Sequence, residues 1–167
     1  MDSAQRERLF LDLFRDNKSR ILRLCSAYLG SSAEAEDLFQ DIMTNVWHHL
    51  PSFRGEAKAS TWLYRIAINT ALMYRRKRKA AQALGRPERM ERPAAAPAEP
   101  ERLADLRRAI AELPGQDRLI VSLLLEGLSY KEIAEITGMT ANYVGVKIAR
   151  IKQALEQRLS EVAHGAV

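Results

Sequence analysis

The sequence predicts an all-α fold: two small helical domains joined by a flexible linker rich in proline and alanine, the second a helix-turn-helix domain. Apolar residues recur at three- and four-residue steps in both outer parts of the chain, as they do along core-facing helices. Residues 80–104 instead contain four prolines, many alanines and few large apolar side chains. We therefore divide the 167 residues into a first domain at 1–79, the linker at 80–104, a second domain at 105–160 and a tail at 161–167.

The first domain begins with an apolar stripe at helical spacing that ends near Gly30. Its members are Leu9, Phe10, Leu13, Phe14, Ile21, Leu24, Cys25 and Tyr28. Ser31 followed by Glu34 has the spacing of a capping box and predicts the start of the next helix. The apolar face of that helix consists of Ala35, Leu38, Ile42, Val46 and Leu50. Pro51 ends it, because proline has no backbone N–H to donate.

The lone cysteine and the N-terminus bear on the compartment of the protein. Cys25 cannot form an intramolecular disulfide, and its place between Leu24 and Tyr28 on the apolar stripe indicates an inert core thiol. Charged residues precede any apolar run, so we expect no signal peptide. No apolar stretch approaches the length that spans a bilayer. These features predict a cytoplasmic protein without direct membrane insertion.

One stripe of the second predicted helix is acidic. At about 100° per residue, five polar side chains fall on a narrow line well away from the apolar face. We call this line the acidic ridge; it consists of Glu34, Asp37, Asp41, Thr44 and His48. Periodicity alone leaves two interpretations open, a solvated helix face and a surface that binds a partner.

The segment from Phe53 to Lys79 combines aromatic and basic side chains. The aromatic residues are Phe53, Trp62, Tyr64 and Tyr74, and the polar or basic residues among and after them are Arg65, Asn69, Arg75, Arg76, Lys77 and Arg78. Aromatic faces beside cations suit unstacked single-stranded bases and their phosphates. The loop at 54–60, which contains Gly55, would let the backbone approach an extruded base. The alternative is that Trp62 and Leu63 simply belong to the core.

The second domain has the signals of four helices. The first ends at Pro114-Gly115 and the second, RLIVSLLLEG, closes at Gly127. A capping-box spacing at Ser129 and Glu132 opens the third, which ends at Gly138, and Thr140 caps the last. The apolar positions of the last helix are Val144, Ile148, Ile151, Leu155 and Leu159. Two helices around a short glycine-bearing turn predict a helix-turn-helix.

In such a motif the second helix enters the major groove, with its early outward residues at base edges and later basic residues at phosphates. That face carries Asn142, Tyr143, Val146, Lys147 and Arg150. Helical spacing alone would also allow an ordinary surface. The net charge of +5 is modest. Basic side chains nevertheless cluster on this face and at residues 75–79, which favours contact with DNA.

The sequence offers no arrangement of residues suited to catalysis. His48 and His49 are adjacent and project from different faces of a helix, and no spacing suits a metal site. We find no glycine-rich phosphate loop and no nucleophile motif. We therefore expect a binding protein that is not an enzyme and that uses no cofactor or metal.

Three segments, in this order, resemble the conserved segments of extracytoplasmic-function sigma factors, which are two-domain bacterial transcription initiation factors. The segments are AEDLFQDIMTNVW, SFRGEAKASTWLYRIAINTA and LPGQDRLIVSLLLEGLSYKEIAEITGMTANYVGVKIARIKQAL. The resemblance covers nearly the whole chain outside the linker and the tail.

The resemblance implies a role for each surface. The residues implied to bind core RNA polymerase are Asp37, Gln40, Asp41 and Thr44. Those implied to read and melt the minus-ten element are Phe53, Arg54, Ser60, Trp62, Arg65, Asn69, Arg75, Arg76 and Arg78. Those implied to read the minus-thirty-five duplex are Thr140, Asn142, Tyr143, Val146, Lys147 and Arg150.

The implied partners are bacterial core RNA polymerase, promoter DNA and an anti-sigma factor. The linker would thread through the polymerase toward the RNA path. The alternative function is a stand-alone helix-turn-helix regulator that binds duplex operators without melting them. In that case the N-terminal half would be an effector or dimerisation domain with its aromatic side chains in the core.

Overall fold

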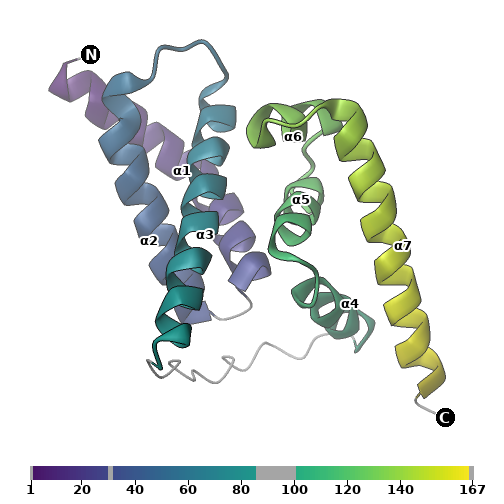
Figure 1. Ribbon diagram of the computed structural model, residues 1–167. Helices are drawn as coiled ribbons and strands as arrows, with labels where there is room; N and C mark the ends of the chain where they lie inside the picture. Colours follow the sequence, from purple (N-terminus) through teal and green to yellow (C-terminus); the bar gives the residue numbers. More distant parts are fainter. Residues whose placement is uncertain (1, 30–31, 86–100, 166–167) are drawn as a thin grey trace.

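The computed structural model describes residues 2–29, 32–85 and 101–165, and every regular element in these ranges is a helix (Figure 1). The N-terminal half consists of α1 (Ser3–Leu29), α2 (Ser32–His49), a short 3-10 helix η1 (Leu50–Ser52) and α3 (Ala59–Ala83). The C-terminal half consists of α4 (Glu101–Ala111), α5 (Gly115–Leu125), α6 (Tyr130–Thr137) and α7 (Ala141–Gly165). The predicted all-α fold class is confirmed.

The N-terminal half is a bundle in which α1, α2 and α3 pack on one another. The predicted apolar faces of α1 and α2 form its interior: Ile21, Leu38, Ile42 and Val46 are fully buried, and so is Leu50, which lies in η1 directly after α2. Helix α3 adds Leu63, Tyr64 and Ala67. Removal of these side chains from water is the main force that holds the bundle together. Cys25 is also buried, which confirms its predicted place in the core.

The C-terminal half is organised by α7, which packs against α4, α5 and α6 (Figure 1). The predicted capping box is present, since Ser129 accepts from the Glu132 N–H and the Glu132 carboxylate accepts from the Ser129 N–H. Gly138 ends α6 with φ +74°, a left-handed conformation that favours glycine. Thr140 Oγ1 accepts the Tyr143 N–H, 3.2 Å away, and so caps α7 as predicted.

Three helix ends differ from the sequence-based boundaries. Helix α3 continues to Ala83 and α4 begins at Glu101, so both ends of the segment assigned to the linker are helical. The sequence AAQA at 80–83 explains the extension, because alanine and glutamine favour helix. Helix α7 likewise runs into the segment assigned to the tail. Ser31 of the predicted capping box, and residues 86–100, lie outside the described residues.

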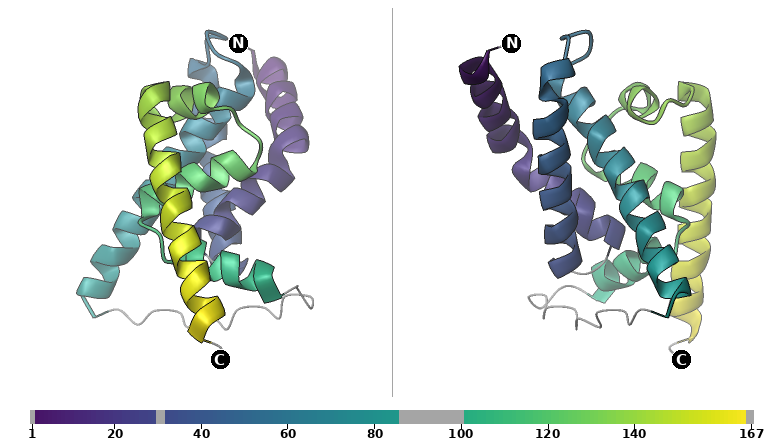
Figure 2. Two further views of the ribbon diagram at one scale, coloured as in Figure 1. Left: turned by 90° about the vertical axis from the view of Figure 1, so that its right-hand side faces the viewer. Right: turned by 60° about the vertical axis from the view of Figure 1, so that its left-hand side comes forward.

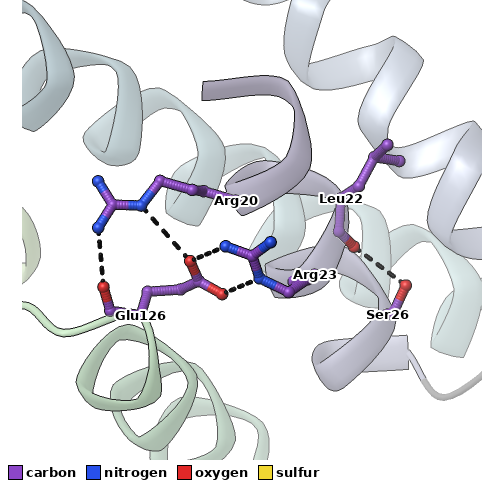
Figure 3. Close-up of polar contacts among 5 residues, drawn as sticks. All are labelled: Arg20, Leu22, Arg23, Ser26 and Glu126. Carbon is purple, nitrogen blue, oxygen red and sulfur yellow. Dashed lines mark hydrogen bonds and ion pairs between the residues drawn. The ribbon is translucent and has the colours of Figure 1, made fainter. Parts of the chain in front are cut away.

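The two halves meet along a surface that we call the seam, where α4, α5 and α6 contact α1 and α3 (Figure 2). Glu126, at the C-terminal end of α5, is the centre of one polar cluster (Figure 3). Arg23 donates to both oxygens of its carboxylate, with N···O distances of 2.7 and 2.8 Å. Arg20 donates to its backbone carbonyl at 2.9 Å. A largely buried carboxylate therefore ties α5 to two arginines of α1.

A second polar contact in the seam is buried. Arg118 of α5 donates to the backbone carbonyl of Tyr28, 2.7 Å away, and to that of Leu113 at 3.2 Å. Tyr28 lies in the last turn of α1, where carbonyls have no partner within the helix. The Arg118 guanidinium thus caps α1 from the other half of the molecule.

Candidate nucleic-acid and polymerase interfaces

The acidic ridge is exposed along most of its length. Asp37, Asp41, Thr44 and His48 face solvent on α2, and so does the neighbouring Gln40. Glu34, at the N-terminal end of the ridge, is half-buried and forms an ion pair with Arg78 of α3. All four residues predicted to bind core polymerase are therefore accessible from outside.

A groove of about 420 Å³ separates the ridge from α3. Asp41 and Thr44 line it from α2, and Asn69 lines it from α3. Asn45 Nδ2 donates to Thr70 Oγ1 at 3.0 Å and so joins the two helices beside the groove. Two predicted polymerase-binding residues, Asp41 and Thr44, thus share one groove with Asn69 of the predicted minus-ten set, an arrangement that the sequence did not predict.

The aromatic side chains of the Phe53 to Lys79 segment divide into two kinds. Tyr64 is buried in the core beside Leu63, and burial raises the pKa of its hydroxyl. Phe53 and Trp62 are half-buried and pack on each other, with ring centroids 5.0 Å apart. The core interpretation therefore holds for Tyr64 and Leu63, whereas the Phe53–Trp62 pair keeps an accessible surface.

The loop before α3 carries the remaining features predicted for base capture. Gly55 has φ +73°, a left-handed conformation that costs glycine little. Arg54 is exposed beside it, and Ser60 in the first turn of α3 is half-buried. The loop and the Phe53–Trp62 pair lie at the same end of α3, because Trp62 is only one turn into the helix.

The polar residues of α3 predicted to contact DNA differ in their exposure and in their contacts within the chain. Asn69 and Arg76 are exposed. Arg65 donates its Nε–H to the backbone carbonyl of Glu135 in α6, 2.8 Å away, and so contributes to the seam. Arg75 is half-buried over the ring of Tyr28, with its Cζ 5.8 Å from the ring centroid. The seam thus engages two of the cations predicted to contact the minus-ten element.

Most of the predicted face of α7 is exposed. Its accessible members are Thr140, Asn142, Tyr143, Val146 and Arg150. Lys147 instead forms an ion pair with Asp117 of α5, and only 16% of its side chain is exposed. This ion pair links α7 to α5. The partners are 30 residues apart in sequence, so helical periodicity gave no signal of it.

Tyr130 is a residue at this face that the sequence analysis did not single out. It is 41% exposed in the first turn of α6, and its ring lies 3.6 Å from the position that a Cβ would take at Gly145. A glycine inside a helix is unfavourable, and its presence can indicate that a neighbour approaches closely. In the sequence, only the glycine at position 145 inside the predicted last helix indicated that a neighbouring side chain packs against this helix.

Among the described residues, no group of three or more His, Cys, Asp and Glu side chains is placed to hold a metal ion. No helix in the described ranges is both long and apolar enough to cross a membrane.

Two family descriptions match the two halves separately. Residues 13–81 match sigma-70 region 2, and residues 103–155 match sigma-70 region 4. Each match falls on the half that carries the corresponding predicted surface. The class that the fold and these matches define is a two-region sigma factor.

Curated relatives make the assignment narrower. The ECF RNA polymerase sigma-E factor of Escherichia coli strain K12 is 33% identical over 155 residues, which are 84% of this chain and 81% of the relative. The RNA polymerase sigma-H factor of Pseudomonas aeruginosa is 30% identical and covers 88% of this chain and 84% of its own length. The ECF sigma factor SigE of Mycolicibacterium smegmatis is 31% identical, but the chain spans only 61% of its length.

Two solved structures have the same fold. The sigma factor RpoE of Bartonella quintana, solved in complex with the anti-sigma factor NepR, has a TM-score of 0.67 at 22% identity and covers 89% of this chain and 97% of that chain. CnrH, solved with the cytosolic domain of CnrY, has a TM-score of 0.69 at 22% identity, with 94% of each chain covered. At this identity the likeness shows the fold alone.

The chain belongs to the extracytoplasmic-function sigma factors of bacterial RNA polymerase. Its partners are core RNA polymerase and promoter DNA, and its function is to direct transcription initiation to promoters. These matches support this function over that of a stand-alone regulator, because region 2 accompanies the helix-turn-helix in the same chain. Members of this family are non-enzymatic transcription initiation factors.

Proposed function

We propose that the two halves divide promoter recognition between unpaired and duplex DNA, while the acidic ridge holds the polymerase. The observation that carries this proposal is the groove between α2 and α3, which the ridge and Asn69 both line. Polymerase bound on Asp41 and Thr44 would bring its own surface to the edge of the face that takes the melted strand. Binding and strand capture would then occur at adjoining sites on one bundle.

In this proposal core polymerase binds Asp37, Asp41 and Thr44 of the ridge and the neighbouring Gln40. Exposed carboxylates in a row steer and orient a basic partner surface. The exposure of all four side chains supports this role.

The minus-ten element is read as single strand by the loop and α3. The exposed edge of the Phe53–Trp62 pair offers a stacking face, and Arg54 and Asn69 supply contacts to phosphates and to base edges. Ser60 lies between the loop and Trp62 and would contact the same strand. Arg76 extends the phosphate track toward the end of α3, and Arg65, Arg75 and Arg78 would join it after leaving their present contacts.

The minus-thirty-five element is read as duplex by α7. Asn142 offers an amide to a base edge, and Tyr143 and Val146 offer apolar contact of the kind that suits a thymine methyl group. Arg150 binds a phosphate one turn beyond them. Thr140 caps α7, and its exposed hydroxyl can also contact the duplex. Lys147 takes part only if its ion pair with Asp117 opens.

The polymerase-binding role is tested by neutralising the ridge. Asp37→Asn combined with Asp41→Asn should weaken binding to core polymerase by about tenfold, chiefly through slower association, because steering by charge is lost. Fluorescence anisotropy of labelled protein titrated with core enzyme measures this. Glu36→Gln is the matched control, since Glu36 is exposed on the same helix but off the ridge. Equal affinities of the double variant and the control would contradict the role.

We further propose that the chain carries out no chemical step of its own and is held inactive by an anti-sigma factor. The fold shared with the sigma factor RpoE of Bartonella quintana, which was solved in complex with the anti-sigma factor NepR, supports this regulation. Co-expression with the product of a neighbouring gene, followed by a transcription assay, tests it. A neighbouring product that neither binds the chain nor lowers its activity would count against it.

A further inference from the structure

A pocket of about 300 Å³ lies in the seam, between the C-terminal part of α3 and the turn that joins α4 to α5. Its polar lining consists of one tyrosine and three cations. These are Tyr28, Arg75, Arg76 and Lys79, and the remaining walls are Leu72, Pro114 and Gly115. No acidic residue is among the described residues that line it.

Two buried groups at this pocket have no hydrogen-bond partner within the described part of the chain. Tyr28 is 1% exposed and its hydroxyl is unpaired, and Nη1 of Arg75 is likewise buried and unpaired. Both lie next to Gly115. A Cβ added at Gly115 would be 2.4 Å from Arg75 Nη1 and 3.4 Å from the Tyr28 hydroxyl oxygen. Two donors that lack acceptors therefore converge on the same wall of the pocket, which in native proteins indicates that a ligand or ordered water completes them.

The N-terminus of α5 reaches the same wall. The helix is 11 residues long, begins at Gly115 and has no side-chain cap at Pro114. The first intrahelical bond is donated by Arg118 to Pro114, so the N–H groups before it are available at the helix end. The helix dipole adds partial positive charge there. Asp117, the acidic residue of the first turn, is already paired with Lys147.

Positive charge is crowded around the pocket. The guanidinium carbons of Arg75 and Arg118 lie 5.8 and 5.7 Å from the Tyr28 ring centroid. Burial lowers the pKa of Arg118, and the neighbouring Arg75 lowers it further. Neither Arg75 nor Arg76 nor Lys79 has an ion-pair partner within the described residues. Like charges held together without a counter-charge destabilise the seam unless an anion joins them.

We propose that this pocket binds a phosphate group, carried by a small ligand or by nucleic acid. The Tyr28 hydroxyl, the Arg75 fork and the first N–H groups of α5 donate to its oxygens, and Arg76 and Lys79 neutralise its charge. The lining comes from both halves, so the bound group fastens the C-terminal half onto α1 and α3. The site shares Arg75 and Arg76 with the phosphate track proposed above, but the Tyr28 hydroxyl and the first N–H groups of α5 have no part in that track. Tyr28→Phe therefore tests the pocket separately from the proposed promoter-reading roles.

The test uses the full-length protein with inorganic phosphate and pyrophosphate as probes, against sodium chloride at equal ionic strength. Phosphate should raise the melting temperature in proportion to the logarithm of its concentration, because a ligand of the folded state stabilises it by mass action. Titration calorimetry gives the affinity. A shift no larger than that in sodium chloride would overturn the proposal.

Two conservative variants and two controls locate the site. Tyr28→Phe keeps the buried ring and removes only the unpaired hydroxyl, and we expect about fivefold weaker phosphate binding. Gly115→Ala displaces the Arg75 guanidinium and should weaken binding by about tenfold. Tyr64→Phe removes another buried, unpaired hydroxyl away from the pocket, and Gly145→Ala adds a methyl group at ordinary contact distance in α7. Both controls should bind phosphate normally.

Circular dichroism melts of each variant without phosphate establish that it is folded. Equal affinities of Tyr28→Phe, Gly115→Ala and their controls would overturn the proposal.

A third probe, a short single-stranded DNA, identifies the source of the phosphate. If Tyr28→Phe loses inorganic phosphate but keeps this DNA, the ligand is a small phosphate compound. If it loses both in the same proportion, the pocket holds a phosphate of the nucleic-acid backbone.

Discussion

The face of α7 and the face of α3 are both predicted to bind DNA, but they differ in how much of each is open. On α7 the side chains predicted to contact DNA are exposed, with Lys147 as the exception. On α3 the seam engages Arg65 and Arg75, and Glu34 engages Arg78. A duplex could therefore meet α7 in this arrangement, whereas full use of α3 requires the two halves to separate.

The difference arises from how the two surfaces are built. The interior of each half is apolar, while the seam includes arginines bonded to carbonyls and to one carboxylate. Apolar packing is hard to undo in part, but polar contacts of this kind are individually modest and can be exchanged for contacts to phosphate. The arginine contacts of the seam can therefore be exchanged for contacts to phosphate, whereas the buried apolar residues of both halves belong to one cluster and resist separation.

The largest effect should come from the buried contact of the seam. Arg118→Met removes both hydrogen bonds to the Tyr28 and Leu113 carbonyls and should lower the free energy of unfolding by about 2 kcal/mol, partly offset by relief of a buried charge. Urea denaturation measures it. Arg102→Met is the control, since Arg102 is exposed on α4. No loss relative to this control would mean that Arg118 does not hold the halves together.

Substitutions of two cations of α7, Lys147 and Arg150, should separate stability from DNA binding. Lys147→Met breaks the half-buried pair with Asp117 and should cost about 1 kcal/mol of stability. Arg150→Met should leave stability unchanged but weaken duplex binding and reduce the salt dependence by about one phosphate contact. Thermal melts and binding at several salt concentrations measure both. The same profile for both variants would contradict this division.

The contacts between Glu126 and the two arginines of α1 should contribute less to stability. Glu126→Gln removes the charge that Arg20 and Arg23 share and should cost somewhat under about 1 kcal/mol, because both arginines are half in solvent. Glu112→Gln is the matched control: its pair with Arg158 lies within the C-terminal half and is well exposed. Hydrogen exchange of α5 should rise only in Glu126→Gln. A rise in neither variant or in both would contradict a role for Glu126 in the seam.

The titration of Cys25 should have the smallest effect on stability, because it begins only above pH 9. The reactivity of its thiol reports on the N-terminal core. Burial raises the pKa of its thiol from 9.0 to about 12. The folded chain therefore keeps the thiol protonated when the unfolded chain has lost its proton, so this contribution to stability is complete below pH 9 and declines as the pH rises toward 12. Alkylation at pH 8 should be negligible without urea and complete with it. Rapid alkylation of the native chain would show that the core opens readily.

Local patterns predicted some features and could not predict others. The acidic ridge, the Ser129 capping box and the Gly138 turn follow from spacing and backbone chemistry within one or two turns of helix. The pairing of Lys147 with Asp117 joins separate helices and has no local signal. Arg118 stands at the edge of an apolar run, where nothing in the sequence indicates that it caps a helix 90 residues earlier. The proposed DNA and polymerase contacts of the predicted residues remain predictions.

The division of work between α3 and α7 is tested most directly by following two steps on one promoter with holoenzyme. Closed-complex formation is measured by binding to duplex promoter, and opening by the fluorescence of a base analogue in the minus-ten element. Asn69→Ala should leave the first step intact and slow the second by about tenfold. Arg150→Ala should weaken the first step and leave the opening rate of bound complexes unchanged. If both variants impair the same step, the two faces do not divide duplex and single-strand recognition.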